Sequence, residues 1–275
     1  MMAKKERVDV LLVERGLVET REKAKRAIMA GLVFSGTERL DKPGLKVEQT
    51  TPLLVKGNVI PYVSRGGLKL EKALHVFSIT LQDKLVIDIG ASTGGFTDCA
   101  LQNGAKKVYA IDVGYNQLAW KLRQDERVIV MERTNFRYVN RTDLQEGLPN
   151  FACMDVSFIS LRLILPVLKQ LLQPSSDVIA LIKPQFEAGR EQVGKKGIVR
   201  DPNVHRTVIE QMTTFAVEVG YSVLGLDYSP IKGGEGNIEF LLHLQVQEEA
   251  SKAKISQAVS IETVVERAHN QLKSV

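Results

Sequence analysis

The sequence predicts a chain of two parts, a small N-terminal α+β domain and a larger α/β domain built on a mostly parallel sheet. From residue 85 onward, short apolar runs typical of strands alternate with helical segments, which is the order expected of a parallel sheet. Before residue 58 the apolar runs are shorter and are separated by glycine turns. The 275 residues are enough for one large domain and one small one.

The N-terminal part begins with two helical segments. Residues 8–15 predict a helix, and Thr20 is placed to cap a second one, which ends at Gly31. Short strands are expected at residues 32–34 and 53–55. These elements predict a compact module of helices and short strands.

The net charge of +5 lies in the first 66 residues, which contain 13 basic and 8 acidic residues. In the remainder of the chain, 24 basic and 24 acidic residues cancel. Such an excess at one end indicates a polyanion-binding region. On charge alone, a solvated helical surface explains it equally well.

The larger domain is expected to contain seven strands. We predict them at residues 85–89, 107–111, 128–131, 151–154, 178–182, 221–227 and 239–245. Seven strands whose last two form a hairpin are typical of class I methyltransferases with a Rossmann-like fold. The predicted boundaries are 1–60 for the small domain, 61–67 for a linker, 68–247 for the large domain and 248–275 for a polar tail that is helical after residue 260.

A glycine turn ends the strand at residues 85–89 and opens a helix, and glycine lets a backbone approach a ligand closely. Ser92 stands where the dinucleotide fingerprint has its second glycine. Asp88 would repel a pyrophosphate but attract the cationic end of S-adenosylmethionine. Asp112 ends the next strand and can accept hydrogen bonds from ribose hydroxyls. The pattern favours S-adenosylmethionine over NAD, with a purely structural turn as the alternative. The expected cofactor contacts are Asp88, Gly90, Ser92, Gly94, Gly95, Phe96, Asp112 and Asp155.

Four ionisable residues occupy positions that matter in such a fold. Lys69 lies on the helix before the first strand, Asp155 ends the fourth strand, Lys183 ends the fifth and Glu239 opens the last. Because the carboxyl ends of parallel strands line the ligand crevice, Asp155 and Lys183 are expected to face it. Taken alone, Lys183 can also mark a strand leaving the core.

The N-terminal part resembles the S4-type RNA-binding domain over about fifty residues. The resemblance rests on Arg7-Val-Asp9, Leu11-Leu12, Gly16, Thr20-Arg21, Ala24, Ile28 and Gly31-Leu-Val33, with Thr20 and Ser35 departing from the usual serine and asparagine. It implies that basic residues of the second helix face RNA phosphates. A basic loop at residues 187–203 is predicted to grip RNA as well, or else is merely solvated. The expected RNA contacts are Arg7, Arg21, Lys25, Arg26, Arg65, Arg190, Lys195 and Lys196.

From about residue 66 to residue 244 the chain resembles the RrmJ/FtsJ-like RNA 2′-O-methyltransferases. With the N-terminal module, the combination resembles the TlyA, or hemolysin A, family of ribosomal RNA methyltransferases. The matching stretches are residues 64–70, 88–96, 155–160, 183–187 and 233–239. The resemblance implies that Lys69, Asp155, Lys183 and Glu239 form the family's catalytic Lys-Asp-Lys-Glu tetrad. It also implies that the substrates are cytidine 2′-hydroxyls of ribosomal RNA in assembled subunits.

The chemistry of a ribose hydroxyl explains why such residues are needed. The hydroxyl must lose its proton as it attacks the methyl group, and we assign this step to Lys183. A neutral lysine can take the proton, whereas an ammonium can stabilise the developing alkoxide. Lys69 would disfavour the charged form of Lys183, and Asp155 and Glu239 would favour it, so both roles stay open.

Other activities fit the sequence less well. Methyl transfer to amino groups uses an Asn/Asp-Pro-Pro-Tyr/Phe motif, where this chain has Asp-Val-Ser-Phe, and transfer to cytosine carbon needs a cysteine nucleophile. Cys99 and Cys153 are interpreted instead as buried core positions. A pseudouridine synthase needs an Arg-Leu-Asp motif on a downstream domain, and residues 39–41 lie in the N-terminal module. A ribosome-binding factor without catalysis is disfavoured by the complete tetrad.

The setting expected from the sequence is the cytoplasm. The chain lacks a run of eighteen apolar residues and a signal-peptide pattern, which argues against a membrane-active protein. Two cysteines and histidines without ligand spacing predict neither disulfides nor a metal site. Ribosomal RNA within ribosomal subunits is the expected partner.

Overall fold

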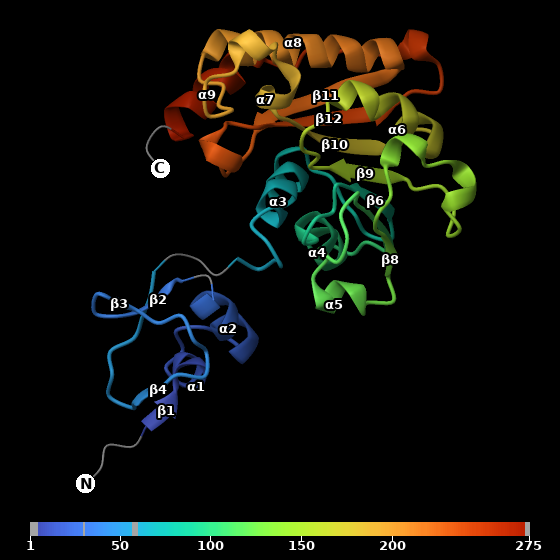
Figure 1. The fold of residues 1–275 in the computed structure, drawn as a ribbon. Coiled ribbons are helices and arrows are strands. Elements are labelled where there is room, and N and C mark those ends of the chain that lie inside the picture. Colours follow the sequence, from blue (N-terminus) through green and yellow to red (C-terminus); the bar gives the residue numbers. More distant parts are fainter. Residues whose placement is uncertain (1–4, 30, 57–59, 273–275) are drawn as a thin grey trace. The chain divides into compact units, whose positions relative to one another are not determined.

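The computed structural model describes residues 5–29, 31–56 and 60–272. The chain divides into two compact units, Met1–Pro61 and Tyr62–Val275 (Figure 1). Each has a hydrophobic core of its own. Tyr62 is buried in the larger unit, and the backbone N–H of Val63 donates to Asp98 Oδ2 at 2.8 Å. Most of the predicted linker therefore packs against the larger unit.

The described residues of the smaller unit form two helices and five short strands. Its elements are β1 (Lys5–Arg7), α1 (Val8–Glu14), α2 (Arg21–Met29), β2 (Val33–Ser35), β3 (Glu38–Arg39), β4 (Lys46–Glu48) and β5 (Leu54–Val55). Strand β1 pairs with β4, and β2 lies between β3 and β5, all antiparallel. The predicted cap is confirmed, because Thr20 Oγ1 accepts from the backbone N–H of Lys23 at 3.2 Å. Strands β1, β3 and β4 were not expected, since they consist largely of charged residues and lack the apolar runs that predicted β2 and β5.

The larger unit is built on a seven-stranded sheet with helices on both faces. Its strands are β6 (Leu85–Ile89), β7 (Lys107–Ile111), β8 (Val128–Met131), β9 (Phe151–Met154), β10 (Asp177–Ile182), β11 (Tyr221–Tyr228) and β12 (Phe240–Val246). Its helices are α3 (Gly67–Val76), α4 (Gly95–Gln102), α5 (Trp120–Arg123), α6 (Leu165–Leu171), α7 (Pro184–Glu187), α8 (Pro202–Val219) and α9 (Ile261–Leu272). Figure 1 shows α8 on one side of β10, β11 and β12 and α3 on the other.

The order of the sheet is β11-β12-β10-β9-β6-β7-β8, and β12 is antiparallel to both of its neighbours. The remaining neighbouring pairs are parallel. The predicted mostly parallel sheet and its last antiparallel pair are thus confirmed. The position of β12 between β10 and β11 was not predicted.

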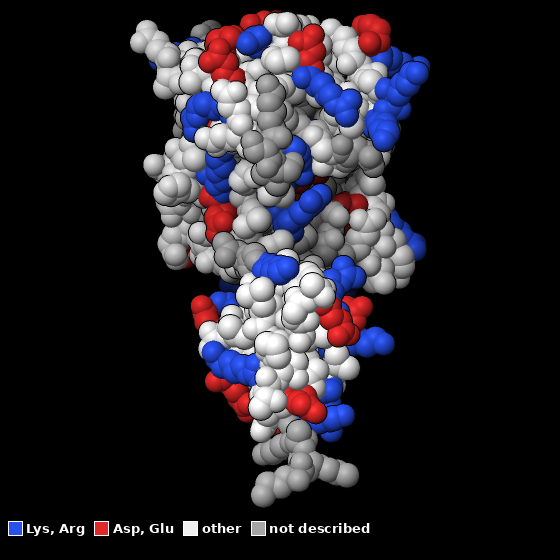
Figure 2. All heavy atoms as spheres, turned by 90° about the vertical axis from the view of Figure 1, so that its left-hand side faces the viewer, with Lys and Arg blue, Asp and Glu red and all other residues white. Residues whose placement is uncertain are grey.

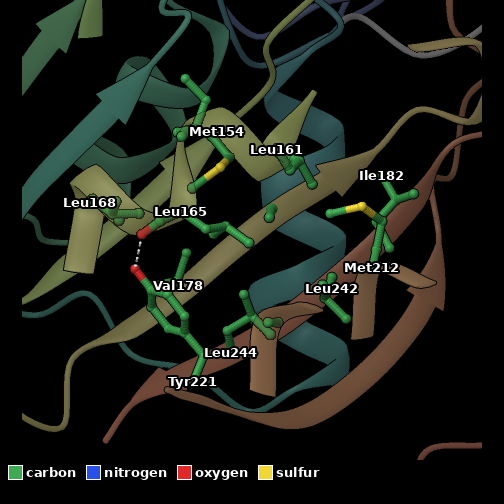
Figure 3. Packing of buried hydrophobic residues seen from close by; sticks show 14 of the residues in the cluster. Met154, Leu161, Leu165, Leu168, Val178, Ile182, Met212, Tyr221, Leu242 and Leu244 are labelled. Carbon is green, nitrogen blue, oxygen red and sulfur yellow. Dashed lines mark hydrogen bonds between the residues drawn. The ribbon is translucent and has the colours of Figure 1, made fainter. Parts of the chain in front are cut away.

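The core on the α6 and α8 side of the sheet contains many aliphatic side chains and includes Tyr221. Figure 3 shows Leu165 and Leu168 of α6 close to Val178 and Tyr221, and the hydroxyl of Tyr221 donates to the Leu165 carbonyl at 2.9 Å. Because this hydroxyl is buried, the hydrogen bond offsets the cost of removing it from water. Helix α9 contributes Val265 and Ala268 to the same cluster, so the predicted tail is part of the domain core.

The sheet brings the predicted site residues to the carboxyl end of its parallel strands. Gly90, Asp155 and Lys183 directly follow β6, β9 and β10, which run in the same direction. Strand β12 runs the opposite way, and its first residue, Phe240, pairs with Ile182, the last residue of β10. Glu239 therefore lies beside Lys183, although 55 residues separate them in the sequence.

Candidate active site

The four residues of the predicted tetrad come together in a chain of alternating charges. Lys69 Nζ lies 2.7 Å from Glu239 Oε2 and 2.8 Å from Asp155 Oδ2. The other carboxylate oxygen of Asp155, Oδ1, lies 2.6 Å from Lys183 Nζ. The order Glu239, Lys69, Asp155, Lys183 joins one helix to the ends of three strands.

These ion pairs are largely shielded from water, so their attraction is screened less than that of a surface pair. The side chains of Lys69 and Lys183 are each 8% exposed and that of Glu239 is 2% exposed. Burial opposes the charge on Lys69, but Asp155 and Glu239 outweigh it and raise the pKa of the ammonium. Burial would also raise the pKa of Asp155, and Lys69 and Lys183 together hold it below its ordinary value. Both groups therefore carry their charge at neutral pH.

Two further side chains hold this arrangement, and sequence reasoning did not single them out. Lys183 Nζ donates to Ser157 Oγ at 2.9 Å. Glu187 accepts from Ser160 Oγ at 2.5 Å and from the backbone N–H of Leu161 at 2.8 Å. Glu187 therefore connects the turn after β10, which carries Lys183, to the loop after β9, which carries Asp155. Both residues lie in the matching stretches, which was the available signal.

The glycine turn after β6 has the predicted shape, but two of its glycines pack against protein. Gly94 has φ of +95°, and a Cβ there would lie 2.3 Å from Leu122 Cδ1. A Cβ on Gly95 would lie 2.3 Å from Ser64 Oγ. Gly90 has φ of +82°, and a Cβ there would lie 3.0 Å from the carbonyl oxygen of Asp155. The glycines thus let α4, α5 and the loop after β9 close around the turn.

Two cavities open at the tetrad. The first, of about 300 Å³, is lined by all four tetrad residues together with Arg65, Phe96 and Gly95. The second, of about 520 Å³, lies over the ends of β6, β7 and β8. Both are lined by Gly90, Ser92, Asp155 and Ser157, so they adjoin at the end of the tetrad that carries Lys183.

The larger cavity carries much of the predicted cofactor set. Gly90, Ser92, Asp112 and Asp155 line it. The carboxylate of Asp112 accepts from the backbone N–H groups of Ser92 at 2.8 Å and Gly114 at 2.7 Å. The loop after β8 also contributes Thr134, Asn135, Phe136 and Arg137, which sequence reasoning missed. The sequence offered one indication of this loop's involvement, namely that it follows the carboxyl end of the third predicted strand.

Asp88 lies beneath the turn and is fully buried. Its Oδ2 accepts from Thr97 Oγ1 at 2.6 Å, whereas Oδ1 has no hydrogen-bond partner among the residues that the structure describes. Burial raises the pKa of this carboxyl group to about 7, and the hydrogen bond from Thr97 opposes the rise. Of the predicted cofactor contacts, Asp88 and Gly94 line neither cavity.

Of the predicted RNA contacts of the smaller unit, Arg21 is exposed and Arg7, Lys25 and Arg26 are half-buried, and each has a partner within the protein. Arg7 and Arg21 both bind the buried carboxylate of Asp9, and Lys25 pairs with Glu22 at 2.9 Å. Arg26 donates to the carbonyl of Pro61 at 3.1 Å. Figure 2 shows Lys and Arg side chains interspersed with Asp and Glu on the face of this unit that it presents.

The basic loop of the larger unit is anchored beside the tetrad. Arg65, Arg190, Lys195 and Lys196 are exposed. Asn237, which is buried, donates to the carbonyl of Gly197 at 2.9 Å and accepts from the backbone N–H of Val199 at 3.1 Å. Because Asn237 stands two residues before Glu239, it ties this loop to the strand that carries a tetrad residue.

The fold and the site together define a class I methyltransferase: one antiparallel strand lies between the last two parallel ones, and a glycine turn follows the first strand. The family model for FtsJ-like methyltransferases matches residues 62–246, and the model for the S4 domain matches residues 6–51. This chain belongs to the FtsJ-like methyltransferase family and carries an S4 domain at its N-terminal end. The predicted resemblance is confirmed.

Relatives match over nearly the whole chain. It is 67% identical over 273 residues to "Putative rRNA methyltransferase YqxC" of Bacillus subtilis (strain 168), a match that covers 99% of this chain and 97% of that protein. It is 41% identical over 268 residues to "16S/23S rRNA (cytidine-2'-O)-methyltransferase TlyA" of Mycobacterium tuberculosis (strain ATCC 25618 / H37Rv). That match covers 97% of this chain and 98% of that protein.

A solved structure resembles the whole chain as well. "Putative hemolysin from Streptococcus thermophilus" has a TM-score of 0.78 and 58% identity, and the match covers 99% of this chain and 98% of that one. In the part of the chain that the structure describes, no helix is long and apolar enough to cross a membrane.

Proposed function

We propose that this enzyme transfers the methyl group of S-adenosylmethionine to the 2′-hydroxyl of a cytidine in ribosomal RNA, within ribosomal subunits in the cytoplasm. The observation that carries the proposal is the buried tetrad at the junction of two cavities. One cavity suits a nucleoside cofactor and the other a ribose. The names of the relatives from M. tuberculosis and B. subtilis support ribosomal RNA as the substrate.

The larger cavity fits S-adenosylmethionine. Ile111, Val113 and Phe136 offer apolar surface for a nucleobase. Asp112 uses its carboxylate for two backbone N–H groups and retains lone pairs that can accept from ribose hydroxyls. The cofactor, when bound, supplies an electrophilic methyl group carried on a cationic sulfur.

In this proposal, Lys183 acts on the attacking hydroxyl. Its Nζ is held by Asp155 Oδ1 and Ser157 Oγ, and Asp155 and Ser157 line both cavities. A hydroxyl beside Nζ can pass its proton to a neutral amine, or its developing negative charge can be stabilised by the ammonium. Lys69 does not exchange protons: its charge neutralises Asp155 and Glu239 and fixes the carboxylate that orients Lys183.

The test is transfer of a tritiated methyl group to ribosomal subunits purified from a strain that lacks the gene. We expect the wild-type protein and Lys106→Ala to label the RNA and to yield 2′-O-methylcytidine after digestion to nucleosides, and Lys183→Ala to label it at least about a thousandfold more slowly. Lys106 is exposed and directly precedes β7, so it lies at the amino end of the parallel strands, opposite the site. Absence of labelling by the wild-type protein contradicts the proposal, and full activity of Lys183→Ala contradicts only the role of Lys183.

The two roles of Lys183 are separated by Lys183→Arg. A guanidinium stays protonated, so it can stabilise an alkoxide but cannot accept its proton. Activity well above that of Lys183→Ala identifies an electrostatic role. Activity as low as that of Lys183→Ala, together with a wild-type rate that rises with pH, identifies a base.

A further inference from the structure

The most exposed hydrophobic side chains of the larger unit lie in the segments that follow three of its parallel strands. Among the described residues of this unit, the large hydrophobic side chains that are at least 66% exposed are Val113, Tyr115, Trp120, Tyr138 and Phe158. They belong to the loops after β7, β8 and β9 or open α5. Because apolar side chains are ordinarily removed from water, such a group indicates a binding surface. Tyr115 and Tyr138 line neither cavity at the tetrad, so the proposed cofactor site does not explain them.

An arginine lies against each of these two tyrosine rings. The guanidinium carbon of Arg133 is 4.0 Å from the centre of the Tyr115 ring, and that of Arg137 is 5.5 Å from the centre of the Tyr138 ring. Both arginines are exposed, and Arg137 also donates to Asn135 Oδ1 at 3.3 Å. Each tyrosine–arginine pair therefore presents an aromatic ring and a positive charge to solvent side by side.

The backbone that carries the first pair is held in place. The carboxylate of Glu132 accepts from the backbone N–H of Asn116 at 2.9 Å and forms an ion pair with Arg123 at 2.6 Å. The backbone N–H of Arg133 donates to the carbonyl of Gly114 at 2.9 Å. Arg133 has φ of +52°, a conformation that residues other than glycine seldom adopt and that is often found at functional sites. The loop after β8 is thus fixed to the loop after β7, which places the guanidinium group on the ring.

Both pairs adjoin the cavity proposed for the cofactor. Val113 stands two residues before Tyr115 and Arg137 directly before Tyr138, and Val113 and Arg137 line the larger cavity. This cavity meets the tetrad cavity at the end that carries Lys183. A ribose that reaches Lys183 stays joined to the nucleotides on either side of it, so those nucleotides cross the loops around the site.

The chemistry of the pairs fits unpaired RNA. Nucleobases that are not paired stack on aromatic rings and on guanidinium planes, and arginine binds phosphate oxygens through its planar fork. We propose that the pairs Tyr115–Arg133 and Tyr138–Arg137 bind unpaired nucleotides next to the target ribose, the rings by stacking on bases and the guanidinium groups by contact with phosphates. This inference rests on the proposed function, and none of the four residues is among the predicted RNA contacts.

The test compares Tyr115→Ala and Tyr138→Ala with Ile255→Ala in methyl transfer to ribosomal subunits from the gene-lacking strain. Ile255 is an exposed hydrophobic residue that bridges to β11, at the edge of the sheet opposite β8. Each tyrosine variant should raise KM for the subunits about tenfold, with a smaller effect on kcat, because one stacked base is lost. Tyr115→Phe keeps the ring and should stay within about twofold of wild type.

The salt dependence separates stacking from charge. Arg133→Gln should lower the slope of log affinity against log salt by roughly 0.7, as expected for one lost phosphate contact. Tyr115→Ala should leave this slope unchanged, because a tyrosine ring carries no charge. A photoreactive benzoylphenylalanine in place of Tyr115 identifies the partner directly, and irradiation on the subunits should attach it to RNA.

The outcomes separate this inference from the proposed function. If the wild-type protein methylates subunits but the tyrosine variants match Ile255→Ala in KM, the inference is wrong and the function stands. A crosslink to ribosomal protein alone also contradicts the inference, as does weaker binding of S-adenosylmethionine to the tyrosine variants in calorimetry with an unchanged KM for subunits. If the wild-type protein transfers no methyl group, the proposed function itself fails.

Discussion

Each of the two units places a carboxylate between two basic side chains. The comparison shows that the kind of basic side chain and its exposure to water decide what each cluster can do. In the smaller unit, Asp9 binds Arg7 at 2.9 Å and Arg21 at 3.0 Å. In the larger unit, Asp155 binds Lys69 at 2.8 Å and Lys183 at 2.6 Å. Both carboxylates are held ionised by their partners, with the pKa of Asp9 lowered to about 2 mainly by the hydrogen bond from Arg7.

The partners differ in exposure and in chemistry. The side chains of Arg7 and Arg21 are 40% and 54% exposed, so Asp9 holds two guanidinium groups that still face water. Such groups can reach an RNA phosphate but cannot take part in proton transfer. Lys69 and Lys183 are almost completely buried and line a cavity. A lysine can take part in proton transfer as a guanidinium cannot, so the same arrangement allows chemistry at Lys183 in one unit and presents charge in the other.

The largest effect is expected from Asp155→Asn. The substitution removes the ion pairs of Asp155 with Lys183 and Lys69, so Lys183 is held less firmly at the junction of the cavities, by Ser157 Oγ. We expect methyl transfer in a single turnover to slow about a thousandfold. A rate within threefold of wild type, with an unchanged unfolding midpoint, would show that Asp155, like Asp9, has a structural role and none in catalysis.

The next effect concerns stability and comes from Asp9→Asn. An amide cannot pair with two guanidinium groups, and Asp9 is fully buried. We expect the free energy of opening of helices α1 and α2, measured by hydrogen exchange, to fall by about 2 kcal/mol. Asp41→Asn, at an exposed position of the same unit, is the matched control and should change it little.

The same carboxylate predicts a dependence on pH. Because the pKa of Asp9 in the folded chain, about 2, lies below its ordinary value of 3.8, the ion pairs stabilise the fold above about pH 4. This stability is lost as the pH falls toward 2. Hydrogen exchange of α1 and α2 at decreasing pH should show the loss in the wild-type chain and much less of it in Asp9→Asn. Equal slopes for the two chains would mean that Asp9 does not govern the small unit.

A smaller effect is expected from Glu187→Gln. It tests whether the tetrad depends on the contact that Glu187 makes between the turn after β10 and the loop after β9. The amide can keep one of the hydrogen bonds from Ser160 and Leu161 but loses the charge. We expect kcat to fall about tenfold with little change in KM for RNA, since Lys183 and Asp155 shift relative to each other. Glu191→Gln, at an exposed position nearby, is the control. A change in KM alone would place Glu187 in substrate binding.

The smallest effect is expected from Arg21→Lys. Lysine retains the charge but lacks the planar fork that binds Asp9 and a phosphate together. We expect RNA affinity, measured by filter binding at fixed salt, to fall about threefold while methyl transfer at saturating RNA persists. Arg39→Lys, an exposed position outside the predicted RNA contacts, should bind like wild type. Equal affinities of the two variants would contradict the presentation of charge by Asp9.

The sequence alone determined the elements of the large unit and much of its site. Apolar runs placed all seven strands to within a residue at each end, because burial leaves a local pattern. The predicted strand at 239–245 is shifted by one residue to Phe240–Val246, which leaves Glu239 just outside the strand. The tetrad was recognised from five separate stretches, although no local rule links Lys69 to Asp155 across 86 residues.

Only the tertiary structure decided what those elements do to one another. The place of β12 between β10 and β11 brings Glu239 beside Lys183, and strand pairing between distant segments leaves no local signature. Gly94 and Gly95 were predicted as cofactor contacts, and only the structure shows that a Cβ on either would overlap Leu122 or Ser64, so the fold also needs them for close packing. Asp9, Glu187 and the loop after β8 gained their roles from contacts made after folding. Sequence patterns record which residues are buried, but the groups that meet in the interior depend on how the buried surfaces pack.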